Sequence, residues 1–246
     1  MTSAVDRPGQ VPLRDVAEGW PVVSSTEQVR GPIVTVRSDL VRMPDGDVVP
    51  RQVVQHPGAV AVVALDGAGQ VLLIRQYRHP VGRLLWEIPA GLRDVAGEPL
   101  HDTAARELVE ETGYAAADWR VLTDFYSSPG ISTERIRVFL ARELHVVPEE
   151  ERDYVASHEE AQLMLRWVDL DTAVHRLLAG DLHNGVTAVG ILSAYAARCG
   201  GFAGLRPADA PEEDSAGSAT EPERSVLDDL FDSVESASAS SESGIF

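Results

Sequence analysis

Hydrophobic and polar positions divide the chain into an N-terminal strand region, a central α/β region and a polar C-terminal region. Apolar residues alternate with polar ones from Ile33 to Met43 and recur from Val48 to His56, which is typical of half-buried strands. Pro44-Asp45-Gly46-Asp47 lies between them and predicts a hairpin turn. Val22-Val23 indicates another strand. Residues 1–57 are therefore expected to form an antiparallel β-region.

Two nearly unbroken apolar segments follow, Ala59 to Leu65 and Val71 to Arg78, separated by Asp66-Gly67-Ala68-Gly69. Such runs indicate strands buried on both faces. The turn sequence predicts that the two strands pair with each other. Later strands are predicted at Arg120 to Phe125, Arg135 to Leu144 and Leu163 to Val168, and helices at Asp169 to Ala179 and Gly185 to Cys199.

A further helix is predicted between Pro99, which fits a first turn, and Gly113, which fits a helix end. The helix from Gly185 to Cys199 is apolar nearly all round and is expected to pack on the sheet. Cys199 is the only cysteine, so no internal disulfide can form. We expect its thiol to be buried. Residues 58–205 are predicted to form one α+β domain.

The composition narrows the functional classes. The chain has 246 residues, 44% of them hydrophobic, and a formal net charge of −18, which argues against sequence-independent binding of nucleic acid. No run of 18 apolar residues occurs and the N-terminus lacks an apolar secretory core, so no membrane association is expected. The single cysteine fits a reducing compartment. The expected location is the cytoplasm.

The C-terminal residues 206–246 are predicted to form an acidic, Ser-rich disordered tail. Within it, the segment 225–235 has apolar residues at helical spacing: Val226, Leu227, Leu230, Phe231 and Val234. A helix this short is marginal alone and could fold in the groove of a protein partner. The alternative is an unselected apolar cluster in a solubilising tail.

The strongest chemical signal is Gly91-x6-Glu98-x7-Arg106-Glu107-Leu108-x-Glu110-Glu111-x-Gly113-Tyr114. Three of its glutamates project from overlapping parts of one helical surface, where like charges repel. A divalent cation would relieve that repulsion, and oxygen-only ligands suit Mg²⁺ or Mn²⁺. The alternative is a solvated acidic face. Chance co-occurrence of the six charged and glycine positions from Glu98 to Gly113 is only on the order of 10⁻⁵ to 10⁻⁴.

This segment resembles the signature of the Nudix hydrolases, Gly-x5-Glu-x7-Arg-Glu-aliphatic-x-Glu-Glu-x-Gly-aliphatic. The sequence departs from it in the six residues between Gly91 and Glu98 and in Tyr114. The resemblance implies an α/β/α sandwich with a mixed sheet and hydrolysis of a diphosphate linked to another group. By the same resemblance, the metal ligands are Glu107 and Glu111, with Glu98 and the carbonyl oxygen of Ala90 assisting.

The resemblance also assigns catalytic roles. Arg106 would pair with a neighbouring carboxylate, the alternative being an ordinary surface ion pair, and Glu110 belongs to the same catalytic set. Carboxylates bound to metal are poor bases, because the cation lowers their pKa. A carboxylate outside the helix is therefore expected to activate the water, and Glu160 matches the family, with Glu159 as the alternative.

Segments outside the signature resemble the ADP-ribose pyrophosphatase branch of the family. The matching segments are Arg75-Gln76-Tyr77-Arg78-His79, Leu85-Trp86-Glu87-Ile88-Pro89-Ala90-Gly91, Ser128-Pro129-Gly130, and Glu159-Glu160-Ala161. The resemblance implies a homodimer that exchanges its N-terminal sheets and splits ADP-ribose into AMP and ribose 5-phosphate.

Five residues are candidate contacts of this nucleotide-sugar substrate. Arg51 and Arg78 could bind phosphate or ribose, the alternative being solvated strand ends. Glu87 could accept a hydrogen bond from the substrate. Trp86 is either part of the core or a platform for adenine, and Glu134 either faces the substrate or is solvated.

Other functions remain open from the sequence. The chain could be a Nudix hydrolase of another nucleoside diphosphate sugar, because the shape of the site decides that choice. It could also be a non-catalytic module that senses ADP-ribose, although such a module would be expected to have lost signature carboxylates. A structural or adaptor role could reside in the tail.

Overall fold

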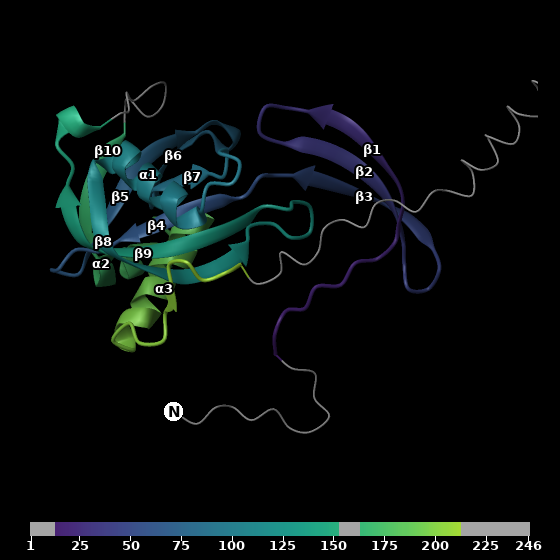
Figure 1. Ribbon diagram of the computed structural model, residues 1–246. Helices are drawn as coiled ribbons and strands as arrows, with labels where there is room; N and C mark the ends of the chain where they lie inside the picture. Colours follow the sequence, from purple (N-terminus) through teal and green to yellow (C-terminus); the bar gives the residue numbers. More distant parts are fainter. Residues whose placement is uncertain (1–12, 153–162, 213–246) are drawn as a thin grey trace, which may run out of the picture. The chain divides into compact units, whose positions relative to one another are not determined.

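The computed structural model describes residues 13–152 and 163–212 (Figure 1). Contacts between Cα atoms separate two compact units. One contains residues 13–28 and Arg37–Gln52, and the other contains Val29–Val36 and Val53–Pro211. Within the described residues, no helix is long and apolar enough to cross a membrane.

A three-stranded sheet forms the predicted N-terminal β-region. Its strands are β1 (Val22–Arg30), β2 (Thr35–Arg42) and β3 (Val48–Gln55), in the order β1-β2-β3. The predicted turn between β2 and β3 is confirmed: the Met43 N–H donates to the Asp47 carbonyl over 2.7 Å, and Gly46 has a φ of 94°. In these strands only Asp39 is buried, and it accepts hydrogen bonds from Ser25 and Arg37.

The larger unit contains two further sheets and three helices. One sheet has the order β11-β8-β9-β4-β7 and is mixed, because β4 runs parallel to β9 and antiparallel to β7. The other has the order β10-β5-β6. The strands are β4 (Ala59–Ala64), β5 (Gln70–Arg78), β6 (Arg83–Glu87), β7 (Ala90–Leu92), β8 (Tyr114–Tyr126), β9 (Arg135–Val146), β10 (Met164–Asp169) and β11 (Arg206–Pro207). The helices are α1 (Leu100–Thr112), α2 (Leu170–Leu178) and α3 (Gly185–Cys199), with short 3-10 turns at His79–Val81 and Glu149–Glu151.

The predicted pairing of β4 with β5 is wrong. The turn forms as expected, since Asp66 accepts hydrogen bonds from the backbone N–H groups of Ala68 and Gln70. Beyond a single bridge between Leu65 and Val71, however, the strands enter different sheets. Both faces of each strand are nevertheless buried: in β5, Val71 and Leu73 belong to one apolar cluster and Leu72 to the other, which explains the continuous apolar run.

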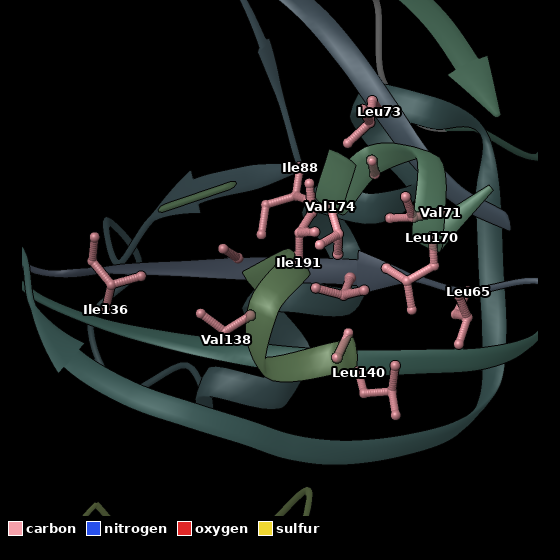
Figure 2. Close-up of a cluster of buried hydrophobic side chains, with 14 residues drawn as sticks. Leu65, Val71, Leu73, Ile88, Ile136, Val138, Leu140, Leu170, Val174 and Ile191 are labelled. Atoms are coloured by element: carbon pink, nitrogen blue, oxygen red, sulfur yellow. The ribbon is translucent and has the colours of Figure 1, made fainter. Parts of the chain in front are cut away.

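The core lies on both faces of β4, as the sandwich fold requires. Val60 and Val62 belong to the cluster under α1, which contains Leu108. Val63 belongs to the cluster under α2 and α3, where Ile191 points toward the sheet (Figure 2). Strand β4 therefore lies between α1 on one side and α3 on the other (Figure 1).

Local signals set the helix boundaries. Pro99 stands at the N-cap of α1, and Gly113 ends the helix with a φ of 73°. The face of α3 that packs on the sheet carries Thr187, Gly190, Ile191 and Ala194. Cys199, predicted to be buried, is exposed. It lies two helical turns beyond Leu192, which is also exposed, so it falls on the outer face of the helix.

The folded unit extends past the predicted boundary at residue 206. Strand β11 pairs with β8, and Arg206 donates to Asp124 over 2.7 Å. Arg137, which is 3% exposed, donates to Asp124 and to the carbonyl oxygens of Ala210 and Pro211. The polar composition of this segment did not predict the attachment, because Arg137 binds backbone carbonyl oxygens of the segment and not its side chains. Residues 213–246, with the segment 225–235, lie outside the described residues.

We predict that a chain ending at Leu205 is less stable than one ending at Glu212. The shorter chain leaves the buried Arg137 without its two carbonyl acceptors and removes Arg206 from Asp124. Its free energy of unfolding should fall by about 2–4 kcal/mol. The chain that ends at Glu212 is the matched control, and its melting temperature in calorimetry should equal that of the full chain. Equal melting temperatures of the two truncations would contradict this role of residues 206–211.

Candidate active site

Strand β7 and helix α1 bring the predicted metal ligands together. The backbone N–H of Ala90 donates to Glu111 over 2.9 Å. At the next residue, Gly91, a Cβ atom would lie only 2.0 Å from Cδ of Glu107. The absence of a side chain at Gly91 therefore allows the Glu107 carboxylate to lie against the strand. This contact gives the signature glycine its function despite the extra residue that follows it.

Arg106 lies at the centre of the carboxylate cluster. Its Nη1 atom is 2.9 Å from Glu107 and 3.3 Å from Glu110, and its Nη2 atom is 3.2 Å from Glu98 and 3.3 Å from Asp94. Four carboxylates thus share one guanidinium, which offsets part of their mutual repulsion. Asp94 could not be recognised from the sequence, because it lies in the irregular loop before α1 and has no fixed spacing.

The three predicted metal-binding carboxylates differ in their environments. Hydrogen bonds from Arg106 and then Thr103 lower the pKa of Glu98. Burial raises the pKa of Glu107 to about 7 and that of Glu111 to about 8. Desolvation disfavours the charged form of these two side chains. Their position against β7 is therefore costly for a carboxylate unless a positive charge lies nearby.

The oxygen donors of this cluster fit a hard divalent cation in their chemistry. Within residues 13–152 and 163–212, however, no three acidic, imidazole or thiol groups converge closely enough to hold an ion as the side chains stand. Arg106 lies among the carboxylates and holds one oxygen of Glu107.

A second element, the hairpin of β5 and β6, carries Arg78 and Glu87. Arg78 binds the carboxylate of Glu87 through Nε at 3.0 Å and Nη2 at 2.7 Å. From the sequence we expected Glu87 to accept a hydrogen bond from the substrate. In the structure it is only 3% exposed and holds Arg78 in place. The charge of Arg78 lowers the pKa of Glu111 and that of Glu87 raises it, although burial is the larger effect.

Trp86 projects from the opposite face of β6 to Glu87, since successive strand residues alternate. It is in register with Arg75, whose guanidinium carbon lies 5.8 Å from the centre of the Trp86 ring. Trp86 also packs against the apolar cluster under α3. This position favours the interpretation of Trp86 as a residue of the core over that of a platform for adenine.

The remaining predicted residues are not joined to the cluster by described contacts. Glu134 accepts a hydrogen bond from Ser127, and its Oε1 atom lies 3.6 Å from Nδ1 of His56. Arg51 belongs to the other compact unit, on β3, where it is exposed and donates to the Pro50 carbonyl. Glu159 and Glu160 lie outside the described residues.

Comparisons with known proteins agree with this geometry. The NUDIX domain profile matches residues 55–187. The chain is 48% identical over 187 residues to the ADP-ribose pyrophosphatase of Mycobacterium tuberculosis (strain ATCC 25618 / H37Rv), covering 76% of this chain and 88% of that relative. It is 38% identical over 161 residues to the ADP-ribose pyrophosphatase of Bacillus subtilis (strain 168), covering 65% and 84%.

A solved structure described as an ADP compounds hydrolase has the same fold. Its TM-score is 0.63 at 20% sequence identity, and the match covers 76% of this chain and 98% of that one. The domain match spans the strand β7, the helix α1 and the hairpin that together form the carboxylate cluster. The chain therefore belongs to the Nudix family.

Proposed function

We propose that the protein hydrolyses the pyrophosphate of ADP-ribose to AMP and ribose 5-phosphate. The observation that carries this proposal is the seating of Glu107 and Glu111 against β7, in a chain similar over most of its length to two ADP-ribose pyrophosphatases. Nudix hydrolases generally need divalent metal ions. For this chain we propose Mg²⁺, with Mn²⁺ as a substitute, because all the available donors are hard oxygens.

In the proposed mechanism, Glu107 and Glu111 would hold the metal, with Glu98 and the Ala90 carbonyl oxygen assisting. When bound, the cation would neutralise charge on the pyrophosphate. Arg106 keeps the carboxylates of α1 in place, and Glu110 serves as one of its anchors. Arg78, which is oriented by the buried Glu87 and 44% exposed, is a candidate contact of a phosphate oxygen.

The water is activated by a carboxylate outside α1. Glu107 and Glu111 would be committed to the cation, which lowers the pKa of a ligand and weakens it as a base. We assign this task to Glu160, with Glu159 as the alternative. Arg51, Glu134 and Trp86 remain candidate contacts of the nucleotide or the terminal ribose, with Trp86 the weakest because of its place in the core.

We also propose a homodimer that exchanges its N-terminal sheets. The sheet of β1, β2 and β3 has little core of its own: apolar side chains at Val29, Leu40 and Val48 are 62%, 39% and 42% exposed. Small sheets of this kind are rarely stable alone. Packing against a second copy would bury these side chains.

The assay that tests the function measures phosphate release from a panel of nucleoside diphosphate sugars, coupled to a phosphatase, with Mg²⁺ or Mn²⁺. ADP-ribose should give the highest kcat/KM. A higher value for another sugar nucleotide would favour that substrate instead. No turnover of any member, together with saturable binding of ADP-ribose, would favour a sensing module.

Replacing a metal ligand should separate catalysis from folding. Glu107→Gln or Glu111→Gln removes a charge without a change of shape and should lower kcat on the order of 10²-fold or more. Because each carboxylate is buried at a cost, thermal stability should be kept or raised. Retention of half the wild-type kcat at saturating Mg²⁺ would remove these residues from the metal site. In the same assay, an unchanged kcat for Glu160→Gln would shift water activation to Glu159.

The glycine of β7 offers a sharper test of geometry. Gly91→Ala places a methyl group where Glu107 lies and should displace its carboxylate, which lowers kcat and weakens Mg²⁺ binding at least about tenfold. Gly67→Ala is the matched control, because nothing lies within 4 Å of its added Cβ. Mg²⁺ titrations monitored by calorimetry measure the effect. Equal Mg²⁺ affinities in the two variants would contradict the proposed contact.

The dimer can be tested by sedimentation. The full chain should sediment as a dimer at micromolar concentration, and Leu40→Asp should shift it toward monomer and lower activity. Thr26→Asp, on an exposed polar position of β1, is the control. A fully active monomeric wild-type protein would rule out the exchanged sheets.

A further inference from the structure

A cavity lies along β6, the edge strand of the β5–β6 hairpin. Its volume is about 340 Å³, and its walls include Arg75, Arg83 and Trp86 from the hairpin and His183 from the loop before α3. The register pairs Arg75 with Trp86 on the face opposite to Glu87, whereas Arg83 shares the face of Glu87. Among the described residues, none assigned to metal binding lines the cavity.

The cavity gathers positive charge that the described residues do not neutralise. Arg75 is half-buried; its guanidinium carbon lies 5.8 Å from the centre of the Trp86 ring, and its Nε atom is buried with no hydrogen-bond partner among the described residues. Arg83 has no ion pair within that part of the chain. The chain has 39 acidic and 21 basic residues, so two arginines without an ion pair in the wall of one cavity are unusual.

The one carboxylate in the wall, Asp181, is already engaged. It accepts a hydrogen bond from Arg176 over 3.0 Å, so its charge is offset on the outer side. Helix α3 begins at Gly185, two residues after His183, and the positive end of its dipole is therefore close to the wall. Both features favour an anion over a neutral or cationic ligand.

We propose that this cavity binds a phosphate monoester of a small sugar or nucleoside. Two guanidinium groups match the charge and the planar donor geometry that phosphate oxygens require. The volume exceeds that of a phosphate group alone and lies at the lower end of small-molecule sites. Leu84 and Trp86 supply apolar surface for the organic part of the ligand. This site is additional to the pyrophosphatase site and does not depend on the proposed substrate.

The test is calorimetric titration of the full-length protein with ribose 5-phosphate, AMP and inorganic phosphate, in the presence of a chelator. Without divalent metal, the carboxylate cluster repels anions, so binding there is suppressed. Ribose 5-phosphate or AMP should bind with one site per chain and more weakly as salt is raised, and ribose should not bind. Inorganic phosphate should bind more weakly than the monoesters.

Substitutions in the cavity wall test whether the ligand binds in this cavity. Arg75→Gln and Arg83→Gln should each weaken binding at least about tenfold, while Arg120→Gln, an arginine of β8 outside the cavity, should leave it unchanged. Arg83 is exposed, so its replacement tests the site without disturbing the core. Binding should persist in Glu111→Gln. Binding that survives both arginine variants, that requires Mg²⁺, or that is absent for all three probes would overturn the proposal.

Discussion

Four carboxylates lie around the single guanidinium of Arg106 in the middle of helix α1, and the surrounding structure has to offset their mutual repulsion. The hydrogen bonds that Arg106 donates to Glu98 and the charges of the neighbouring glutamates raise the pKa of Arg106, so its positive charge is permanent. The other side of the same helix inserts Ala104 and Leu108 into the core. Apolar burial therefore holds the acidic face of α1 against β7.

The parts of the fold that local chemistry determines could be predicted from the sequence. Helix α1 was recognisable because Pro99 and Gly113 mark its ends and the glutamate spacing marks its face. The position of the Glu107 carboxylate could not be predicted, because it depends on the close approach of Gly91, which belongs to strand β7. Alternation and apolar runs report how many faces of a strand are buried, but not which strand is its neighbour. The error at β4 and β5 has this origin.

Pairings between side chains were harder to predict than their positions. The sequence offered Glu87 as an acceptor for the substrate, but the antiparallel register of β5 and β6 decides that it binds Arg78. In α3, apolar residues on nearly every side concealed the face that Cys199 occupies. The C-terminal boundary of the domain was predicted too early in the chain for a related reason. Arg137 binds the backbone of Ala210 and Pro211 and not their side chains.

The parallel pairing of β4 with β9 has a consequence for synthesis on the ribosome. Ala59 pairs with Ile136, so the partners are roughly 77 residues apart. At about 5–20 residues per second, β4 waits for several seconds before β9 has left the ribosome. During that time a strand buried on both faces in the folded protein exposes Val60, Val62 and Val63 to water. Nascent chains of this protein are therefore most prone to aggregate, and most dependent on chaperones, between the emergence of β4 and that of β9.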